Sequence, residues 1–309
     1  MNIIYYAAGA DPEVWLKAFR HYLPDAQIRI WEEGDTAPAD YALVWKPPAA
    51  MLRGRTELKA IFNLGAGVDA ILQLGDALPV GVPLIRVDDA GMGVQMAEYV
   101  AHAVLRHFRR FDEYQHLQDE NQWQPLTPQR KEEFSIGVLG LGALGHRIIE
   151  GLRVFGFPIL GWSRSLKQID GVQCFAGEAG LQEFLSKTKV LVLILPLTKE
   201  TENLLDKSKL ALLKPGAYVI NVARGAHIVE EDLLSLIQSG HIAGATLDVF
   251  REEPLPKAHP FWTEKRIHIT PHISALTVRD ESAKQIAGKI AALERGETVA
   301  GLVDQLKGY

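Results

Sequence analysis

The sequence predicts an α/β protein with parallel sheets, divided into two domains. Short apolar runs alternate with helical patterns through most of the chain, and this alternation is typical of parallel strands joined by helices. The chain has 309 residues, of which 47% are hydrophobic. It is therefore long enough to form two domains, each with its own core.

The first predicted domain consists of residues 1–97 together with residues 277–309. Its apolar runs and helical patterns, in order, cover residues 3–7, 14–22, 27–31, 41–45, 58–64 and 84–87. A glycine loop, Asn63 to Val68, follows directly after one predicted strand, at the end where parallel sheets bind ligands. The backbone N–H groups of such a loop suit an anion, and a plain β-turn is the alternative interpretation.

A long helical pattern over residues 93 to about 121 is expected to connect the two domains. Its first part carries an apolar stripe, and its second part mixes aromatic with charged residues before it ends near Pro125. This second part cannot bury its aromatic side chains alone, so we expect it to contact a second copy of the chain in a homodimer. A surface helix with scattered aromatic residues is the alternative.

The most specific motif lies early in the second predicted domain, residues 98–276. An apolar run enters a glycine turn and a helical pattern leaves it. Gly140 permits the tight turn, Gly142 leaves room for a pyrophosphate, and Gly145 lets helix and strand pack closely. The N-terminus of the helix, at Ala143 and Leu144, offers N–H donors to phosphates. The strand, turn and helix together predict a dinucleotide site, whereas glycines alone would indicate only a turn.

The end of the next strand predicts which dinucleotide binds. Enzymes that use NAD usually place an acidic residue there for the ribose 2′-hydroxyl, but this chain has Ser163, Arg164 and Ser165. A guanidinium suits a 2′-phosphate, so we expect NADP, with NADPH preferred over NADH. An ordinary solvated arginine is the alternative interpretation.

The remaining strand ends of the second domain carry the candidate chemistry. Arg224 is followed by Gly225, which lets the backbone turn so that the guanidinium can face a cleft and grip a carboxylate or carbonyl oxygen. His272 follows Pro271, and an imidazole is the side chain best suited to exchange a proton near neutral pH. A histidine alone would be weak evidence, and the neighbouring arginine and carboxylates strengthen it.

Composition excludes several functions. The formal net charge is −5 and charges of both signs are mixed along the chain, so no nucleic-acid partner is expected. Cys174 is the only cysteine, which fits a reducing compartment and rules out intramolecular disulfides and thiolate metal clusters. No apolar run approaches a membrane span and the first residues resemble a strand, so we expect no membrane partner, no metal and a cytoplasmic location.

Five motifs in order resemble the D-isomer-specific 2-hydroxyacid dehydrogenases. They are Gly140 to Gly145, Pro196 to Thr201, Asn221 to Gly225, Asp248 to Phe250 with Glu253-Pro254, and Thr270 to Ser274. The resemblance covers nearly the whole chain. It implies two Rossmann-like domains, an active site in the cleft between them, and a dimer. Within the family, residues 162–165, residues 45–48 and the short length most resemble bacterial reductases that act on glyoxylate and hydroxypyruvate.

Carried onto matching positions, the resemblance implies that Arg224, Glu253 and His272 are the catalytic residues. It places Asp248 beside the nicotinamide. Ala66 and Gly67 correspond to the loop that receives the substrate carboxylate. The further implied cofactor contacts are Leu195, Pro196, Val222 and Ala223. Trp45 could bound the substrate pocket and favour small substrates, although a buried tryptophan is more often part of a core.

The expected activity is NADPH-dependent reduction of a small 2-oxo acid. The resemblance implies that His272 supplies the proton, that Glu253 stabilises the imidazolium, and that Arg224 binds the carboxylate and the carbonyl oxygen. One alternative is a dehydrogenase for a larger 2-oxo acid. Another is a non-catalytic protein that binds a dinucleotide, because the fold also hosts such proteins.

Overall fold

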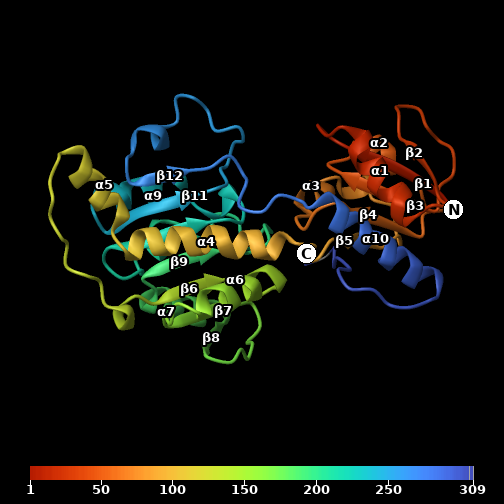
Figure 1. Cartoon of the computed structure of the whole chain (residues 1–309). Coiled ribbons are helices and arrows are strands. Elements are labelled where there is room, and N and C mark those ends of the chain that lie inside the picture. Colours follow the sequence, from red (N-terminus) through yellow and green to blue (C-terminus); the bar gives the residue numbers. More distant parts are fainter. Residues whose placement is uncertain (306, 309) are drawn as a thin grey trace. The chain divides into compact units, whose positions relative to one another are not determined.

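The computed structural model describes residues 1–305, 307 and 308, and the chain divides into two compact units (Figure 1). Unit 1 contains Met1–Met92 and Thr277–Tyr309, and unit 2 contains Gly93–Leu276. Leu306 and Tyr309, which the sequence analysis assigns to the first domain, lie outside the described residues. The two predicted sets of α/β elements are confirmed. The chain first passes from unit 1 to unit 2 after Met92, at the start of helix α4 (Met92–Phe108), whereas we expected this boundary after residue 97 of the same helix. The boundary lies earlier because the side chains of α4 from Met96 onward pack in a core of unit 2.

Unit 1 is built on a five-stranded parallel sheet with the order β2-β1-β3-β4-β5. The strands are β1 (Asn2–Ala7), β2 (Gln27–Ile30), β3 (Tyr41–Trp45), β4 (Ala60–Asn63) and β5 (Leu84–Arg86). The helices are α1 (Pro12–Tyr22), α2 (Ala49–Leu52), α3 (Asp69–Leu72) and α10 (Arg279–Glu294), with a 3₁₀ turn η1 (Gly75–Ala77). All four residues of β4 are buried, as expected for a strand covered on both faces.

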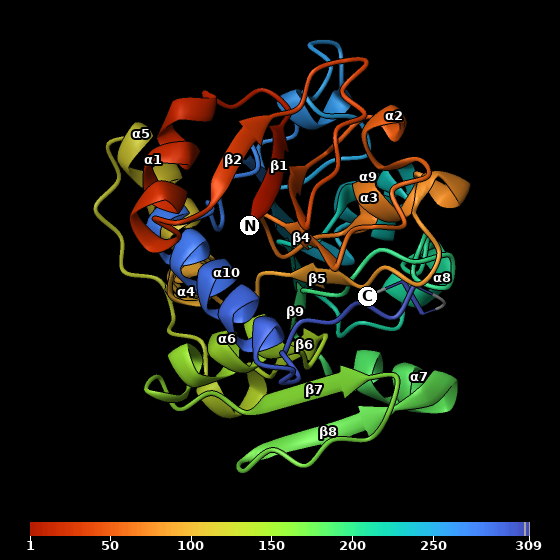
Figure 2. The ribbon, with the colours of Figure 1, turned by 90° about the vertical axis from the view of Figure 1, so that its right-hand side faces the viewer.

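The C-terminal helix α10 completes unit 1, as the sequence predicts. It packs beside α1 (Figure 2). The buried Lys289 ammonium donates hydrogen bonds to Arg86 O and to Asp88 Oδ2, both at 2.8 Å. The backbone N–H of Asp88 donates to Gln285 Oε1 at 2.8 Å. These bonds tie α10 to the chain just beyond β5, so two segments far apart in the sequence form one unit.

Unit 2 is built on a seven-stranded parallel sheet with the order β12-β11-β10-β9-β6-β7-β8. The strands are β6 (Ile136–Leu139), β7 (Ile159–Ser163), β8 (Val172–Ala176), β9 (Val190–Leu193), β10 (Ala217–Asn221), β11 (Ile242–Leu247) and β12 (Ile267–Ile269). The helices are α4 (Met92–Phe108), α5 (Phe111–Asp119), α6 (Ala143–Arg153), α7 (Gly177–Lys187), α8 (Lys207–Leu210) and α9 (Glu230–Gln238). Short 3₁₀ turns are η2 (Lys131–Glu133), η3 (Gly225–His227) and η4 (Pro260–Thr263).

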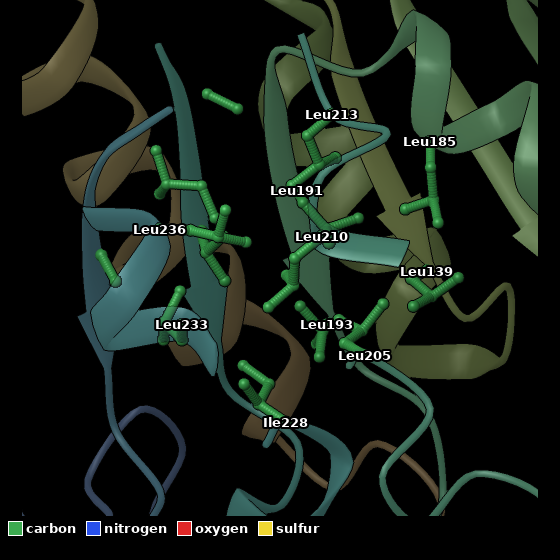
Figure 3. Close-up of a cluster of buried hydrophobic side chains, with 14 of the residues drawn as sticks. Leu139, Leu185, Leu191, Leu193, Leu205, Leu210, Leu213, Ile228, Leu233 and Leu236 are labelled. Atoms are coloured by element: carbon green, nitrogen blue, oxygen red, sulfur yellow. The ribbon is translucent and has the colours of Figure 1, made fainter. Parts of the chain in front are cut away.

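Side chains on the two faces of this sheet enter two separate cores. In β9, Val190 and Val192 join the core formed with α4 and α6, whereas Leu191 and Leu193 join the core formed with α7, α8 and α9. Figure 3 shows part of the second core, in which leucines of β6, β9, α8 and α9 converge. Because both faces are buried, these strands are continuous apolar runs without alternation.

The strand order reverses at β6, which places the candidate site. The chain proceeds from β6 to β7 on one side, and it returns to β9 on the other side of β6. Ligands of open parallel sheets bind outside the carboxyl ends of the strands at such a reversal. The glycine turn follows β6 directly, and β9, β10 and β11 end beside it in the sheet. The topology therefore gathers the loops that the sequence analysis selected.

The predicted long helix is wrong in one respect, because it is two helices. α4 ends at Phe108 and α5 begins at Phe111. Between them, Arg110 has φ of +58°, a left-handed conformation that a continuing right-handed helix cannot contain. The Arg110 guanidinium donates to Glu113 Oε1 at 2.7 Å and to Thr127 O at 2.9 Å. These contacts stabilise the break and fold the segment after α5 back.

Candidate active site

The glycine turn after β6 contains two glycines that the fold requires and one that it does not. Gly140 has φ of +124°, and a Cβ there would lie 2.8 Å from Ile194 O. A Cβ at Gly145 would lie 2.0 Å from Gly140 O, so helix α6 can approach the strand only with a glycine there. Gly142 has an ordinary φ of −82°, and a Cβ there would meet no atom within 4 Å.

Open space over Gly142 fits a bound diphosphate. The first N–H groups of α6, which begins at Ala143, have no partner inside the helix and lie at an exposed turn. No contact within the protein explains a glycine at position 142, whereas a ligand packed against the turn would explain it. The residues present therefore fit the diphosphate of a dinucleotide.

The candidate 2′-phosphate residues lie at the carboxyl end of β7. Ser163 ends the strand, and its hydroxyl donates to Ser165 O at 2.7 Å, which fixes the turn. Arg164 is exposed on this turn. Glu200 lies close enough for the Arg164 charge to contribute to a lowered Glu200 pKa, although the hydrogen bond with Thr198 is the main cause. Arg164 thus lies at the exposed carboxyl end of β7.

Four further predicted cofactor contacts lie around the ends of β9 and β10. Leu195 follows β9 and its backbone runs against the glycine turn, because a Cβ at Gly140 would lie 3.1 Å from Leu195 N. Pro196 is partly exposed, whereas Val222 and Ala223 are buried. The structure brings these residues to one edge of the sheet with the glycine turn. Their contact with a cofactor stays a prediction.

The loop that carries Arg224 is held from beneath by buried polar groups. The buried Asn221 side chain donates to Arg224 O at 3.0 Å and accepts from Ala223 N at 3.0 Å. A Cβ at Gly225 would lie 1.9 Å from the carbonyl carbon of Phe250, so only glycine fits there. This tight packing sets the direction in which the Arg224 side chain leaves the strand end.

His227 is a residue that the sequence analysis did not select. It is fully buried, with Nδ1 3.0 Å from Arg224 O and Nε2 3.2 Å from Pro196 O. It therefore joins the Arg224 loop to the loop after β9. The only sequence signal for it is its position two residues after Gly225, and that signal does not distinguish it from a surface histidine.

Glu253 and His272 form a hydrogen-bonded pair. His272 Nδ1 lies 2.8 Å from Glu253 Oε2, and Glu253 Oε1 accepts from Phe250 N at 3.0 Å. Burial raises the pKa of Glu253, but the His272 hydrogen bond, the Phe250 N–H and the charge of Arg224 together hold the pKa below its usual value. The carboxylate is therefore charged at neutral pH, and the three predicted catalytic side chains lie together in unit 2.

The imidazole of His272 is partly exposed, and one of its nitrogens is engaged within the protein. Its side chain is 45% exposed, and Nδ1 is the nitrogen engaged by Glu253. A charged carboxylate only accepts hydrogen bonds, so Nδ1 carries a proton. Nε2 is then the atom that can exchange a proton with a ligand. A carboxylate that binds one ring nitrogen in this way commonly orients the other nitrogen of a catalytic histidine toward its substrate.

Asp248 anchors the loop that carries His272. It is fully buried, and its Oδ1 accepts from Thr270 Oγ1 at 2.6 Å and from Ile273 N at 2.8 Å. Its Oδ2 accepts from Ser274 N at 2.8 Å. The predicted contact of Asp248 with a nicotinamide stays a prediction, and the anchoring is a role that the sequence did not reveal.

The predicted substrate residues Trp45, Ala66 and Gly67 lie in unit 1, at the ends of β3 and β4. The buried Asn63 amide donates to Gly65 O and Gly67 O, both at 2.8 Å, and so fixes the glycine loop. The Trp45 ring lies against Gly65, where a Cβ would come within 2.7 Å of the indole. The structure therefore places Trp45 beside the loop, with its indole partly exposed.

The described part of the chain lacks both a membrane-spanning helix and a cluster of metal ligands. No helix in it is long and apolar enough to cross a membrane. No group of three or more His, Cys, Asp or Glu side chains in it is arranged to hold a metal ion.

A parallel sheet with a glycine turn at its reversal point, beside a histidine–carboxylate pair and an arginine, defines a dinucleotide-dependent oxidoreductase. Comparison with known proteins agrees with this class. The family model for the NAD binding domain of D-isomer specific 2-hydroxyacid dehydrogenases matches residues 101–274. The chain belongs to the D-isomer specific 2-hydroxyacid dehydrogenase family.

Similar proteins are alike over their full length. Glyoxylate/hydroxypyruvate reductase A of Serratia proteamaculans is 53% identical, with both chains covered completely. A D-isomer specific 2-hydroxyacid dehydrogenase of Xanthobacter autotrophicus, solved with NADPH and MES, is 39% identical with a TM-score of 0.94 over 100% of this chain and 99% of that one. The NADPH-dependent glyoxylate/hydroxypyruvate reductase of Sinorhizobium meliloti, solved with NADP and sulfate, is 33% identical with a TM-score of 0.92 and the same coverage.

Proposed function

We propose that this protein reduces small 2-oxo acids with NADPH, converting glyoxylate to glycolate and hydroxypyruvate to D-glycerate. The observation that carries the proposal is the 2.8 Å contact between Glu253 and His272, with Arg224 near the pair, in the unit that holds the glycine turn. A protein that only bound a dinucleotide would have no use for an oriented proton donor there. The names of the similar proteins support glyoxylate and hydroxypyruvate as substrates.

The three side chains divide the work. Protonated His272 gives its Nε2 proton to the carbonyl oxygen of the substrate as that oxygen gains negative charge. Glu253 holds the ring by Nδ1 and places its negative charge beside it. Arg224 pairs with the carboxylate and the carbonyl oxygen, which orients the substrate and polarises the bond. The hydride comes from the reduced nicotinamide when it is bound.

The two units have different proposed roles, one in binding the cofactor and the other in binding the substrate. Unit 2 binds the cofactor through the glycine turn, with Ser163, Arg164 and Ser165 receiving the 2′-phosphate. Unit 1 contributes the loop at Ala66 and Gly67, whose backbone N–H groups suit the substrate carboxylate. Trp45 lies against this loop and bounds the space available to a substrate, which favours small 2-oxo acids.

A substrate panel tests this proposal. Loss of NADPH absorbance is measured with glyoxylate, hydroxypyruvate and bulkier 2-oxo acids, and each assay is repeated with NADH. We expect the two small acids to give the highest kcat/KM and NADPH to exceed NADH. NADPH binding without turnover of any 2-oxo acid would contradict the proposal, and faster turnover of a bulky acid would contradict the assigned substrate class.

We further propose that the protein acts as a homodimer in the cytoplasm. The arm from α5 to residue 130 exposes large aromatic side chains, including Phe111 and the fully exposed Trp123. A second copy of the chain would cover them. Light scattering on a size-exclusion column should give twice the chain mass, and Trp123→Ser should weaken the association. A strict monomer at micromolar concentration would contradict the dimer.

A further inference from the structure

The segment from Thr270 to Leu276 carries His272 and has an unusual conformation. It follows β12 as irregular chain, and His272 has φ of +55°. A residue other than glycine adopts this left-handed region only where its surroundings hold it there. The contacts that hold this segment therefore determine where the imidazole lies.

Helix α4 contacts both ends of this segment. At one end, Tyr99 Oη lies 2.5 Å from Thr270 Oγ1. At the other end, the Gln95 amide donates to Leu276 O at 2.9 Å and accepts from Leu276 N at 3.1 Å. Residues 95 and 99 lie one helical turn apart and therefore share one face of α4. One helix face thus clamps the segment on either side of His272.

The direction of each hydrogen bond follows from counting protons. Asp248, when charged, only accepts, so the single hydroxyl proton of Thr270 goes to Asp248 Oδ1 at 2.6 Å. Tyr99 must then be the donor to Thr270. Burial raises the pKa of Tyr99 to about 12, so the phenol keeps its proton at any pH at which the protein works. A directed chain runs from Tyr99 through Thr270 to Asp248.

This chain ends at the backbone beside His272. Asp248 accepts from the N–H groups of Ile273 and Ser274, and the His272 N–H donates to Asp248 O at 2.9 Å. Without the Thr270 hydroxyl, the buried Asp248 carboxylate would lose one of its three hydrogen-bond donors. The Tyr99 hydroxyl keeps that threonine in place.

We propose that Tyr99 and Gln95 of α4 are positioning residues for His272. They hold the segment from Thr270 to Leu276 in the conformation in which Nδ1 meets Glu253 and Nε2 faces the substrate. This inference rests on the proposed function, in which His272 is the proton donor. Neither side chain needs to touch the substrate, because both act through the loop.

Tyr99→Phe is the main test, because it removes the hydroxyl and keeps the ring. We expect kcat with glyoxylate to fall about 10-fold, since a small misplacement of a catalytic group is costly, while KM for NADPH stays within about twofold. Gln95→Leu should have the same effect, and a double variant with Tyr99→Phe should lose more than either alone. Thr270→Val should behave like Tyr99→Phe, whereas Thr270→Ser, which retains the hydroxyl, should keep most of the rate.

Tyr218→Phe is a matched control. Tyr218 is also buried in unit 2, and its hydroxyl pairs with Thr246 Oγ1 at 2.8 Å instead of with a residue of the segment from Thr270 to Leu276. It should lower the melting temperature without changing kcat. Hydrogen exchange supplies a readout that does not depend on activity. The amide hydrogens of Ile273 and Ser274 should exchange faster in Tyr99→Phe, and their exchange rates should be unchanged in Tyr218→Phe.

Combination with His272→Gln separates this inference from the proposed function. If Tyr99 acts through His272, Tyr99→Phe should cause no further loss of rate in the His272→Gln background. An additive loss, or a normal kcat in Tyr99→Phe when His272→Gln is slow, overturns the positioning role alone. A normal kcat in His272→Gln overturns the proposed function itself.

Discussion

His272 Nδ1 and Glu253 Oε2 lie 2.8 Å apart although nineteen positions separate the two residues in the sequence. One follows β12 and the other lies in the loop after β11, and these two strands are parallel neighbours. The carboxyl ends of parallel neighbours meet at one edge of a sheet, so the topology itself brings the acid to the imidazole. The charge of Arg224, which follows β10, also acts on this carboxylate.

Replacing the imidazole should stop proton transfer. His272→Gln keeps a polar side chain of similar size but cannot donate a proton as an acid, so kcat should fall about 100-fold or more. The measurement is steady-state NADPH oxidation with glyoxylate. His259 pairs with Glu230 at 3.5 Å elsewhere in unit 2, and His259→Gln serves as the control that should keep its rate. An undiminished rate in His272→Gln would remove this residue from the mechanism.

The sequence was sufficient for much of the fold and for the choice of loops. Local patterns predicted most strands of both sheets, because strands buried on both faces are short continuous apolar runs. The edge strand β8, which is mostly only partly buried, was not predicted. The rule that parallel sheets bind ligands at strand ends then selected Arg224 and His272 without any contact being known, and the family resemblance singled out Glu253 among the nearby carboxylates. The structure places these three together in unit 2.

Contacts between distant residues could not be predicted in the same way. Asp248 accepts from the N–H groups of residues 273 and 274, and His227 lies between two loops, and no local pattern encodes either contact. The break at Arg110 was also missed, because arginine rarely adopts φ of +58° and one of its partners, Thr127, lies beyond the predicted helix. These details depend on tertiary packing and not on periodicity.

Gly142→Ala should separate cofactor binding from folding. A Cβ there meets no protein atom within 4 Å, so the melting temperature should not fall, but the methyl group would oppose the diphosphate. We expect the Kd for NADPH, measured by fluorescence titration, to rise about 10-fold or more, equivalent to about 1.4 kcal/mol.

Two other glycines provide the controls for that measurement. Gly145→Ala should destabilise the protein by about 1–3 kcal/mol, because its Cβ would lie 2.0 Å from Gly140 O. Gly288→Ala lies on an exposed face of α10 with open space and should leave the Kd unchanged. Normal NADPH affinity in Gly142→Ala would mean that the diphosphate does not lie against this turn.

Arg164→Ser should change the choice of cofactor. Loss of the guanidinium removes a charged partner of the 2′-phosphate, so kcat/KM for NADPH should fall about 10-fold or more. NADH lacks that phosphate, and its kcat/KM should stay within about twofold. Arg153→Ser, at the far end of α6, is a control in which both values should be unchanged. Equal losses of kcat/KM for the two cofactors would show that Arg164 does not bind the 2′-phosphate.

His107 should make the protein sensitive to acid. Its ring stacks on Tyr218 with centroids 4.4 Å apart, and burial lowers its pKa to about 4. In the unfolded chain the pKa of His107 is about 6.5, so below that pH His107 binds a proton in the unfolded state but not in the folded state. Stability is therefore lost as pH falls from about 6.5 to about 4, by about 1.4 kcal/mol per pH unit.

His107→Phe keeps the stacked ring and removes this titration. The difference in free energy of unfolding between variant and wild type, measured by urea denaturation, should move in favour of the variant as pH falls through this window. Above pH 7 the difference should be constant. A difference independent of pH from 7 to 4 would show that His107 is not held neutral.

Arg224 should contribute to both binding and chemistry, because its guanidinium would face two oxygens of the substrate. Arg224→Lys keeps the charge but cannot form two parallel hydrogen bonds, so we expect KM for glyoxylate to rise and kcat to fall together, with kcat/KM reduced about 100-fold. Arg224→Gln should lose more, because it also removes the charge. Both variants should keep most of the wild-type melting temperature, since Asn221 and the Gly225 contact still hold the loop backbone. If the rate losses were matched by a fall in melting temperature, Arg224 would be a structural residue, and the substrate carboxylate would need another partner.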